Sequence, residues 1–179
     1  MNSLLNVLNV TSSSCIVVPA ATEENGGPNA RAGAGVAAGA TEGFQLSIPI
    51  TDEEDPFPVR SNQRAELIAA KEGLKFLGLL AEMNEESAHH RFQQDTPVWI
   101  VATDSEYVVR GMTEWVPTWK RRNWRTSKGT TPVNLDLFLA LEEEVVKHEK
   151  ANVKVGFWYI PRRYNGLADS LAKAAAGTL

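Results

Sequence analysis

An uninterrupted apolar run at residues 98–102, Val-Trp-Ile-Val-Ala, constrains the fold of this chain more than any other feature. The run is followed directly by the polar residues Thr103, Asp104 and Ser105. A short apolar run bounded by polar turn residues is typical of a strand that is buried on both faces. The sequence therefore predicts a sheet in which this segment is a well-covered strand.

The segments around this strand follow a simple order. Three strand-type segments come first, at residues 15–18, 31–39 and 44–50, and the clearest helical period follows at 62–80. The later elements are expected to be a helix from about 105, a helix over 135–148, a strand over 153–160 and a helix from about 166. Three leading strands followed by alternating helices and strands predict an α/β domain with a mixed sheet.

The size and composition of the chain fit one globular domain. The 179 residues are about the length of a single domain, and a content of 43% hydrophobic and 22% charged residues is ordinary for a globular protein. Residues 1–14, rich in Ser and Asn, are expected to be a weakly ordered lead-in. Residues 15–179 are expected to form the domain, as a monomer.

The sequence also bears on location. No apolar run approaches the roughly 18 residues that a membrane-spanning helix needs. The first 14 residues contain no Arg or Lys, so neither a signal peptide nor an Arg-rich transit peptide is predicted. The single cysteine, Cys15, cannot form an intrachain disulfide and is expected to be a buried strand residue. We therefore expect an intracellular protein, nuclear or cytoplasmic, with no support for a mitochondrial address and no membrane partner.

Charge is distributed unevenly along the chain. The formal net charge is −4, but residues 1–97 carry 6 basic and 13 acidic groups, whereas residues 98–169 carry 11 basic and 9 acidic groups. The second region contains a cationic segment interleaved with tryptophan: Trp119, Lys120, Arg121, Arg122, Trp124, Arg125 and Lys128. Such a segment can neutralise phosphates while its rings pack or stack. A solvated helix face with core tryptophans is the alternative.

Three acidic residues lie at the boundaries of predicted elements: Glu66, Asp104 and Asp169. Glu66 lies in the first turns of a helix, Asp104 directly follows the buried strand, and Asp169 lies near the start of the last helix. Strand ends and helix starts in an α/β sheet converge on one crevice. A carboxylate cluster there could hold Mg²⁺, although an acid in a first helical turn can also serve only as a cap or dipole partner.

Other polar residues give weaker signals. The loop at 51–58 contains four acids and two prolines and is expected to be solvated. His89 and His90 lie in a polar loop without acidic residues at a metal-ligand spacing. Neither feature predicts a metal site.

The local sequences around the three acids resemble the ribonuclease H type 1 family. The matching segments are Asn-Gln-Arg-Ala-Glu-Leu at 62–67, Ala-Thr-Asp-Ser-Glu-Tyr-Val at 102–108 and Ala-Asp-Ser-Leu-Ala at 168–172, in the order of that family's later catalytic signatures. Trp115 and the segment 119–125 resemble its tryptophan-rich basic protrusion, and the match extends through 132–138. The resemblance covers roughly residues 15–176.

The resemblance implies a fold, an activity and a set of site residues. The fold would be the ribonuclease H-like fold, a five-stranded mixed sheet flanked by helices. The activity would be endonucleolytic cleavage of the RNA strand of an RNA–DNA hybrid, with up to two Mg²⁺ or Mn²⁺ ions held by Glu66, Asp104 and Asp169. The implied substrate contacts come from Asn62 and Gln63 in the minor groove, Ser105 beside the site, and Trp119, Lys120, Arg121, Arg122, Trp124 and Arg125.

The chain departs from the family at the first catalytic position. The family opens with an Asp-Gly pair six residues before an Asn-Gly or similar turn, and counting back from Asn25-Gly26 places Pro19-Ala20 there. Proline offers no side-chain oxygen and removes a donor from the strand ladder, so the strand is expected to be distorted or to end early. Glu23 or Glu24 is the nearest substitute carboxylate. The loop at 160–166 is also short and contains no histidine.

These observations leave competing functions. The chain could be a hybrid-cleaving nuclease with an intact or rescued metal site. It could instead be a pseudo-nuclease that binds hybrids or a protein partner without cutting, or an interaction module that uses the fold alone.

Overall fold

A computed structural model of the protein describes residues 13–23, 30–38, 44–57, 61–85 and 96–178. A single sheet contains strands β1 (Ser13–Val17), β2 (Ala20–Glu23), β3 (Arg31–Ala37), β4 (Gln45–Ile50), β5 (Val98–Thr103) and β6 (Lys154–Tyr159). The order is β2-β3-β1-β5-β6, with β4 on the other side of β3. β5 pairs in parallel with β1 and β6, whereas β3 is antiparallel to β1, β2 and β4. The predicted mixed α/β sheet is confirmed.

β1 and β2 are two parts of one strand that is broken at Pro19. Val17 of β1 pairs with Ala37 of β3, and Ala20 of β2 pairs with Ala34 of β3. Between them the Pro19 carbonyl still accepts a hydrogen bond from the Gly35 amide, at 3.1 Å. Proline has no amide hydrogen to donate, so the ladder is interrupted at this residue. The predicted distortion is confirmed, and the sheet is five strands wide although six segments are assigned.

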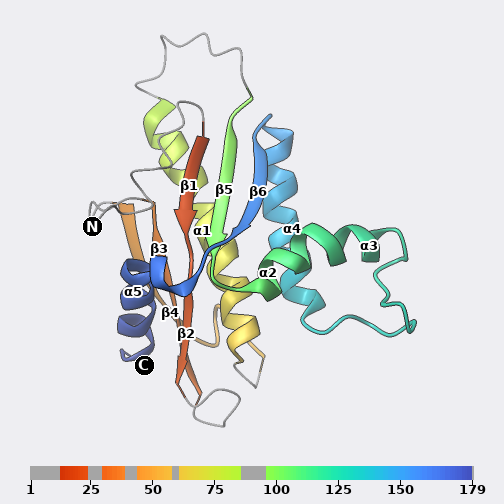
Figure 1. The fold of residues 1–179 in the computed structure, drawn as a ribbon, viewed down its shortest axis with the longest axis horizontal. Helices are drawn as coiled ribbons and strands as arrows, with labels where there is room; N and C mark the ends of the chain where they lie inside the picture. The colour runs from red at the N-terminus through yellow and green to blue at the C-terminus, as the bar shows by residue number, and fades with distance from the viewer. Residues whose placement is uncertain (1–12, 24–29, 39–43, 58–60, 86–95, 179) are drawn as a thin grey trace.

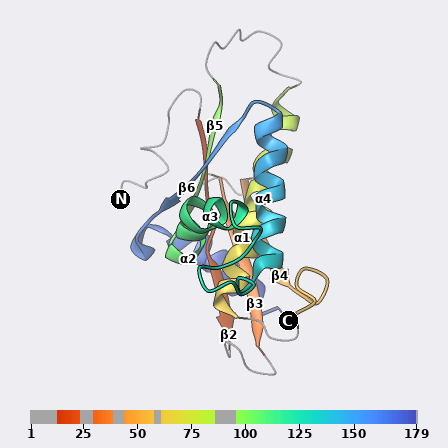
Figure 2. The same cartoon turned by 90° about the vertical axis from the view of Figure 1, so that its right-hand side faces the viewer.

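Helices cover the two faces of the sheet unequally. α1 (Asn62–Glu85) and α4 (Leu135–Lys150) pack against each other on one face, as Figure 2 shows. α5 (Gly166–Ala176) packs on the other face, mainly against β2, β3 and β4. Its residue Ala168 also joins a buried cluster with Ala102 at the end of β5, so on this face α5 covers β5 only at that end.

This unequal cover corrects one expectation from the sequence. Val101 is fully buried under the α1 layer, but Val98 and Ile100, which point to the other face, are only half-buried. The strand is not buried on both faces along its whole length, because α5 covers only its end, where Ala102 is buried in one cluster with Ala168. Cys15 of the neighbouring β1 is half-buried for the same reason, and burial raises the pKa of its thiol to about 11.

α5 approaches the sheet closely because two glycines of β3 lie beneath it. A Cβ atom at Gly35 would lie 2.0 Å from the Ala168 carbonyl oxygen, and one at Gly33 would lie 2.3 Å from that of Ala172. Only residues without a side chain allow this contact. The close approach fixes the height of α5, which carries Asp169, above the sheet.

A separate helical segment projects beyond β6 in Figure 1. It contains α2 (Glu106–Arg110), the π-helix η3 (Gly111–Trp115), α3 (Val116–Lys120) and the loop that leads to α4. Trp115 and Trp119 anchor it, because both rings pack against Phe138 of α4. No helix among the described residues is long and apolar enough to cross a membrane.

Element bounds follow the sequence patterns closely. α1 continues five residues past the expected end at 80, and β1 begins two residues inside the expected lead-in at 1–14. The rest of that lead-in, the turn at Asn25-Gly26, Glu24, His89 and His90 lie outside the described residues.

Candidate active site

The three predicted acids lie at one end of the sheet. Glu66 and Asp104 line a crevice of about 480 Å³ between β2, α1 and α5, and Asp169 is tied to two other lining residues, Arg162 and Lys173. The remaining walls come from Ala20, Ala21, Thr22, Glu23, Asn62 and Ala176. The structure therefore brings together residues that are far apart in the sequence.

Glu66 is held in place by Ser105. The Ser105 hydroxyl donates to Glu66 Oε2 at 2.5 Å, and the same hydroxyl oxygen caps α2 by accepting from the Val108 amide. Burial raises the pKa of Glu66, and the nearby Asp104 charge acts in the same direction. Ser105 thus lies beside the site, as the family resemblance implies.

Asp104 follows β5 directly and is positioned by Asn165. The Asn165 amide nitrogen donates to Asp104 Oδ1 at 3.0 Å. Asn165 is only 1% exposed, and its main-chain carbonyl accepts from the Asp169 amide at the start of α5. It therefore orients one carboxylate with its side chain and begins the helix that carries another. No motif in the sequence predicts this role for Asn165; its place just before Gly166 and the last helix is the only local signal for it.

Asp169 has two cations beside it. Arg162 Nη2 lies 3.2 Å from Asp169 Oδ1, and Lys173 Nζ lies 2.6 Å from Asp169 Oδ2. Partial burial alone would raise the pKa of Asp169, but the hydrogen bonds from Lys173 and Arg162 lower it. Arg162 also faces Asp104, with Nε 3.9 Å from Oδ2.

This arrangement does not fit a metal site as it stands. Ribonucleases H depend as a family on divalent metal ions. Among the residues that the structure describes, no three His, Cys, Asp or Glu side chains are placed to hold one ion. Metal-binding carboxylates must offer free oxygens, whereas here the chain's own donors occupy the crevice.

Pro19 is the residue that the family resemblance aligns with the first catalytic acid. It is buried in the broken strand, and Ala20 and Ala21 line the crevice next to it. Glu23 also lines the crevice, but its carboxylate pairs with Arg31 at 3.2 Å. Glu23 as a substitute carboxylate stays a prediction.

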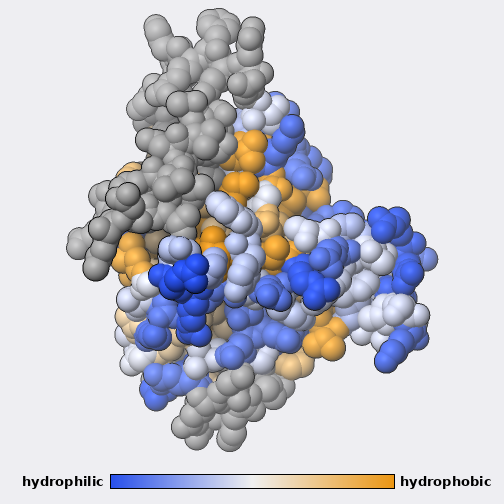
Figure 3. Space-filling view, viewed as in Figure 1, coloured by the Kyte–Doolittle hydropathy of each residue, from blue (hydrophilic) through white to orange (hydrophobic). Residues whose placement is uncertain are grey.

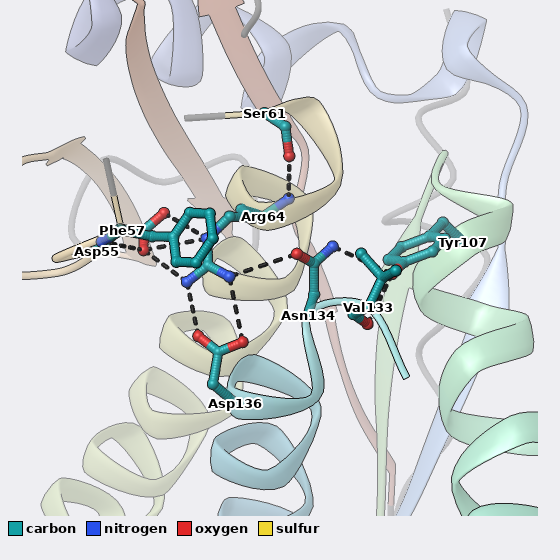
Figure 4. A network of polar contacts seen from close by, with 8 residues as sticks. All are labelled: Asp55, Phe57, Ser61, Arg64, Tyr107, Val133, Asn134 and Asp136. Atoms are coloured by element: carbon teal, nitrogen blue, oxygen red, sulfur yellow. Dashed lines mark hydrogen bonds and ion pairs between the residues drawn. The ribbon is translucent and has the colours of Figure 1, made fainter. Parts of the chain in front are cut away.

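A buried arginine, Arg64, stabilises the start of α1 through a network of polar contacts (Figure 4). Asn62 and Glu66 lie on the same part of this helix. Arg64 is 3% exposed and binds Asp55 through Nε and Nη2, at 2.7 to 3.1 Å. It also contacts Asp136 of α4 at 2.7 Å. Burial alone would lower the pKa of Arg64, but the hydrogen bonds to Asp55 and Asp136 raise it, so the guanidinium stays charged.

This network corrects the expectation of a solvated 51–58 loop for one of its four acids, whereas Asp52 and Glu53 are exposed as expected. Asp55 is 1% exposed because it is the buried counter-ion of Arg64. Asn134 extends the network, accepting from Arg64 Nη1 at 3.4 Å and donating to the Tyr107 hydroxyl at 3.2 Å. Arg64 lies between Asn62 and Glu66 in a matched motif, which was a signal of its importance. The sequence could not predict its partners, because Asp55 is 9 and Asp136 is 72 residues away along the chain.

The cationic segment is divided between packing and exposure. Trp119 packs against Phe138, and Trp124 packs against the same core. Both rings are partly buried, and their contact with a substrate stays a prediction. Lys120 pairs with Glu142 of α4. Lys120 is exposed, as are Arg121, Arg122, Arg125 and Lys128 in the hydrophilic projection at the right of Figure 3.

Comparisons with known proteins agree with this geometry. The RNase H family model matches residues 20–177. Ribonuclease H of Pseudomonas paraeruginosa is 39% identical over 92 residues, which are 51% of each chain. Ribonuclease H of Bordetella avium is 32% identical over 127 residues, 68% of this chain and 69% of that protein.

A solved structure has the same fold. It is LC11-RNase H1, isolated from compost by a metagenomic approach, in complex with an RNA/DNA hybrid. The TM-score is 0.59 at 19% identity, covering 92% of this chain and 96% of that chain. This chain spans about half the length of the Pseudomonas relatives that it matches. The family match begins at residue 20, directly after Pro19.

Proposed function

Because this chain belongs to the ribonuclease H family, we propose that it binds RNA–DNA hybrids and cleaves the RNA strand slowly or not at all. The observation that carries this proposal is the crevice, where three acids of the family pattern lie together but the fourth position holds a proline. The family relation favours hybrid binding, and the state of the crevice favours impaired hydrolysis.

Binding is supported by two surfaces that do not depend on catalysis. Asn62 lines the crevice and Gln63 is exposed next to it, at the start of α1. In a hybrid the minor groove presents the 2′-hydroxyl groups that distinguish RNA from DNA, and amide side chains can hydrogen-bond to them. The exposed cations of the projecting loop offer contacts to backbone phosphates.

Impaired cleavage is supported by charge. Phosphodiester hydrolysis with two metal ions requires a pair of ions about 3.5–4 Å apart. Two Mg²⁺ or Mn²⁺ ions would carry four positive charges, whereas Glu66, Asp104 and Asp169 supply three negative charges that Arg162 and Lys173 partly neutralise. Retaining two ions at this site would therefore be difficult.

The direct test measures binding and cleavage separately. We expect the unmodified chain to bind a labelled hybrid while leaving its RNA strand largely intact in Mg²⁺ or Mn²⁺. Restoring the family pair by Pro19→Asp with Ala20→Gly should raise the cleavage rate by at least about tenfold, the lower end of the effect of residues that support a metal site.

A control and a contrary outcome complete the test. Glu66→Gln added to the restored variant should remove the gained cleavage and leave hybrid binding in place. Rapid cleavage by the unmodified chain, lost on Glu66→Gln or Asp104→Asn, would instead establish an active nuclease. Absence of hybrid binding would leave an interaction module as the function.

A further inference from the structure

Most carboxylate oxygens in the crevice have a donor or a cation of the chain itself beside them. Asp104 Oδ1 accepts from Asn165, and Asp104 Oδ2 faces Arg162. Asp169 Oδ1 and Oδ2 face Arg162 and Lys173 respectively. Glu66 Oε2 accepts from Ser105. Both oxygens of each aspartate and one oxygen of the glutamate therefore have a donor or a cation beside them.

The two cations are placed by local structure. Arg162 begins the short 3-10 helix η4 (Arg162–Tyr164), which directly follows β6 and Pro161 and joins them to α5. Lys173 lies one helical turn after Asp169 on α5, an i,i+4 spacing that places the two side chains on one face. Both positions are therefore consequences of the path of the chain between β6 and the end of α5.

Burial differs between the cations and the acids. The side chains of Asp104 and Asp169 are 20% and 16% exposed, whereas those of Arg162 and Lys173 are 71% and 63% exposed. The cations thus reach from the surface over carboxylates that are mostly buried. Arg162 faces both carboxylates, and a positive charge between two carboxylates offsets the repulsion between them.

We propose that Arg162 and Lys173 are built-in counter-ions that replace divalent metal in this crevice. Arg162 bridges Asp104 and Asp169, which is the role a shared metal ion would have, and Lys173 neutralises the second oxygen of Asp169. The charge of the crevice is balanced inside the chain, so the fold gains little from Mg²⁺. This inference concerns the crevice of the proposed function but depends on no nucleic acid.

The experiment removes the counter-ions and measures metal response without substrate. The variant is Arg162→Gln with Lys173→Gln. The control is Arg163→Gln with Lys150→Gln, which has the same change in charge: Arg163 stacks on Tyr164 and Lys150 is exposed at the end of α4. Thermal unfolding is followed in EDTA and in Mg²⁺, and calorimetric titration with Mn²⁺ measures ion binding.

The expected results separate the proteins clearly. The unmodified chain and the control should unfold at the same temperature in EDTA and in Mg²⁺. The counter-ion variant should be less stable in EDTA and regain about 2–4 °C in Mg²⁺, the shift that a modest stabilisation gives a domain of this size. Its Mn²⁺ affinity should exceed that of the unmodified chain by about tenfold or more, because two nearby positive charges have been removed.

A conservative variant tests charge rather than shape. Arg162→Lys with Lys173→Arg keeps both charges and should behave like the unmodified chain. If the double Gln variant does not fold, the single Arg162→Gln variant gives the same comparison. An unmodified chain that Mg²⁺ stabilises as strongly as the Gln variant, or a control that responds as the variant does, would overturn the inference. Neither result would alter a measured hybrid affinity, so the two proposals fail separately.

Discussion

At the scale of single residues, the site depends on side chains whose partners are distant in the sequence. Arg64 supports the start of α1 by binding two acids. The side chain of Asp55 is buried, at 1% exposure, whereas that of Asp136 is 59% exposed. Removing one partner of a buried ion pair leaves an uncompensated charge, whereas an exposed partner can be replaced by water. The two acids should therefore differ greatly in their importance.

We predict that Arg64→Ala lowers the free energy of unfolding by about 3–5 kcal/mol, because Asp55 is left buried without its counter-ion. Asp136→Asn should cost no more than about 1 kcal/mol, since that side chain is largely exposed. Denaturant unfolding monitored by circular dichroism measures both. Equal losses for the two variants would show that Asp55 is not the principal partner.

A second prediction concerns pH and His148 of α4. Burial lowers the pKa of His148, and the neighbouring Lys147 adds to this effect, so the folded protein holds the ring neutral more strongly than the unfolded chain does. Stability should thus be complete above the unfolded pKa of about 6.5 and should fall as the pH decreases below it. The ring packs against Trp99 at 4.7 Å between centroids.

The measurement compares unfolding free energies between pH 7.5 and 5.5. The unmodified chain should lose stability over this interval, and His148→Gln should lose distinctly less, because its side chain does not titrate. The variant also corrects for contributions from His89 and His90. Parallel pH profiles would assign the loss to groups other than His148.

At the scale of elements, the height of α5 above the sheet decides where Asp169 lies. Gly33 and Gly35 of β3 permit the close contact with α5, and both would clash with its backbone if they carried a Cβ. A clash with backbone cannot be relieved by rotating a side chain. The helix must shift as a whole, and Asp169, Lys173 and the contact with Arg162 must shift with it.

Gly35→Ala should therefore destabilise the fold by about 1–3 kcal/mol or more, as overpacking of a tight interface does. Gly166→Ala is the matched control, because nothing lies within 4 Å of a Cβ atom at that position of α5. Thermal unfolding compares the two. A Gly35 variant as stable as the Gly166 variant would show that α5 can move away from β3 at little cost.

At the scale of the whole molecule, exposed cations form two groups at opposite ends of α4. The exposed cations of the loop precede α4, and Lys147, Lys150 and Lys154 lie at or just beyond its other end. A helix of 16 residues is about 24 Å long, so the two cationic groups are well separated. A hybrid that lies across the crevice and the loop would contact only the first group.

We predict that the triple variant Arg121→Ala, Arg122→Ala and Arg125→Ala binds the hybrid more weakly. The slope of log affinity against log salt concentration should become shallower by roughly 0.7–0.9 for each phosphate that is no longer neutralised. The triple change Lys147→Ala, Lys150→Ala and Lys154→Ala removes equal charge and should have a much smaller effect. Fluorescence anisotropy over a range of salt concentrations measures both. Identical salt slopes for the two triple variants would leave the loop a solvated surface.

The sequence alone was sufficient for the order of strands and helices, the family and the three acids at element ends. These features depend on local periodicity and on motifs within a few residues. The break at Pro19 was also predictable, since a residue without an amide hydrogen interrupts any ladder in which it lies. Local chemistry decides such features whatever the rest of the chain does.

Only the tertiary structure decided what each acid faces. Asp55 was expected in solvent and is buried by Arg64, and Asp169, predicted to bind metal, lies beside Arg162 and Lys173. Ile100 remained half-buried because α5 covers only the end of β5. The physical reason is that electrostatic interactions and burial depend on distances in space. Strand pairing and helix packing bring distant parts of the chain together, so separation along the sequence does not predict these distances.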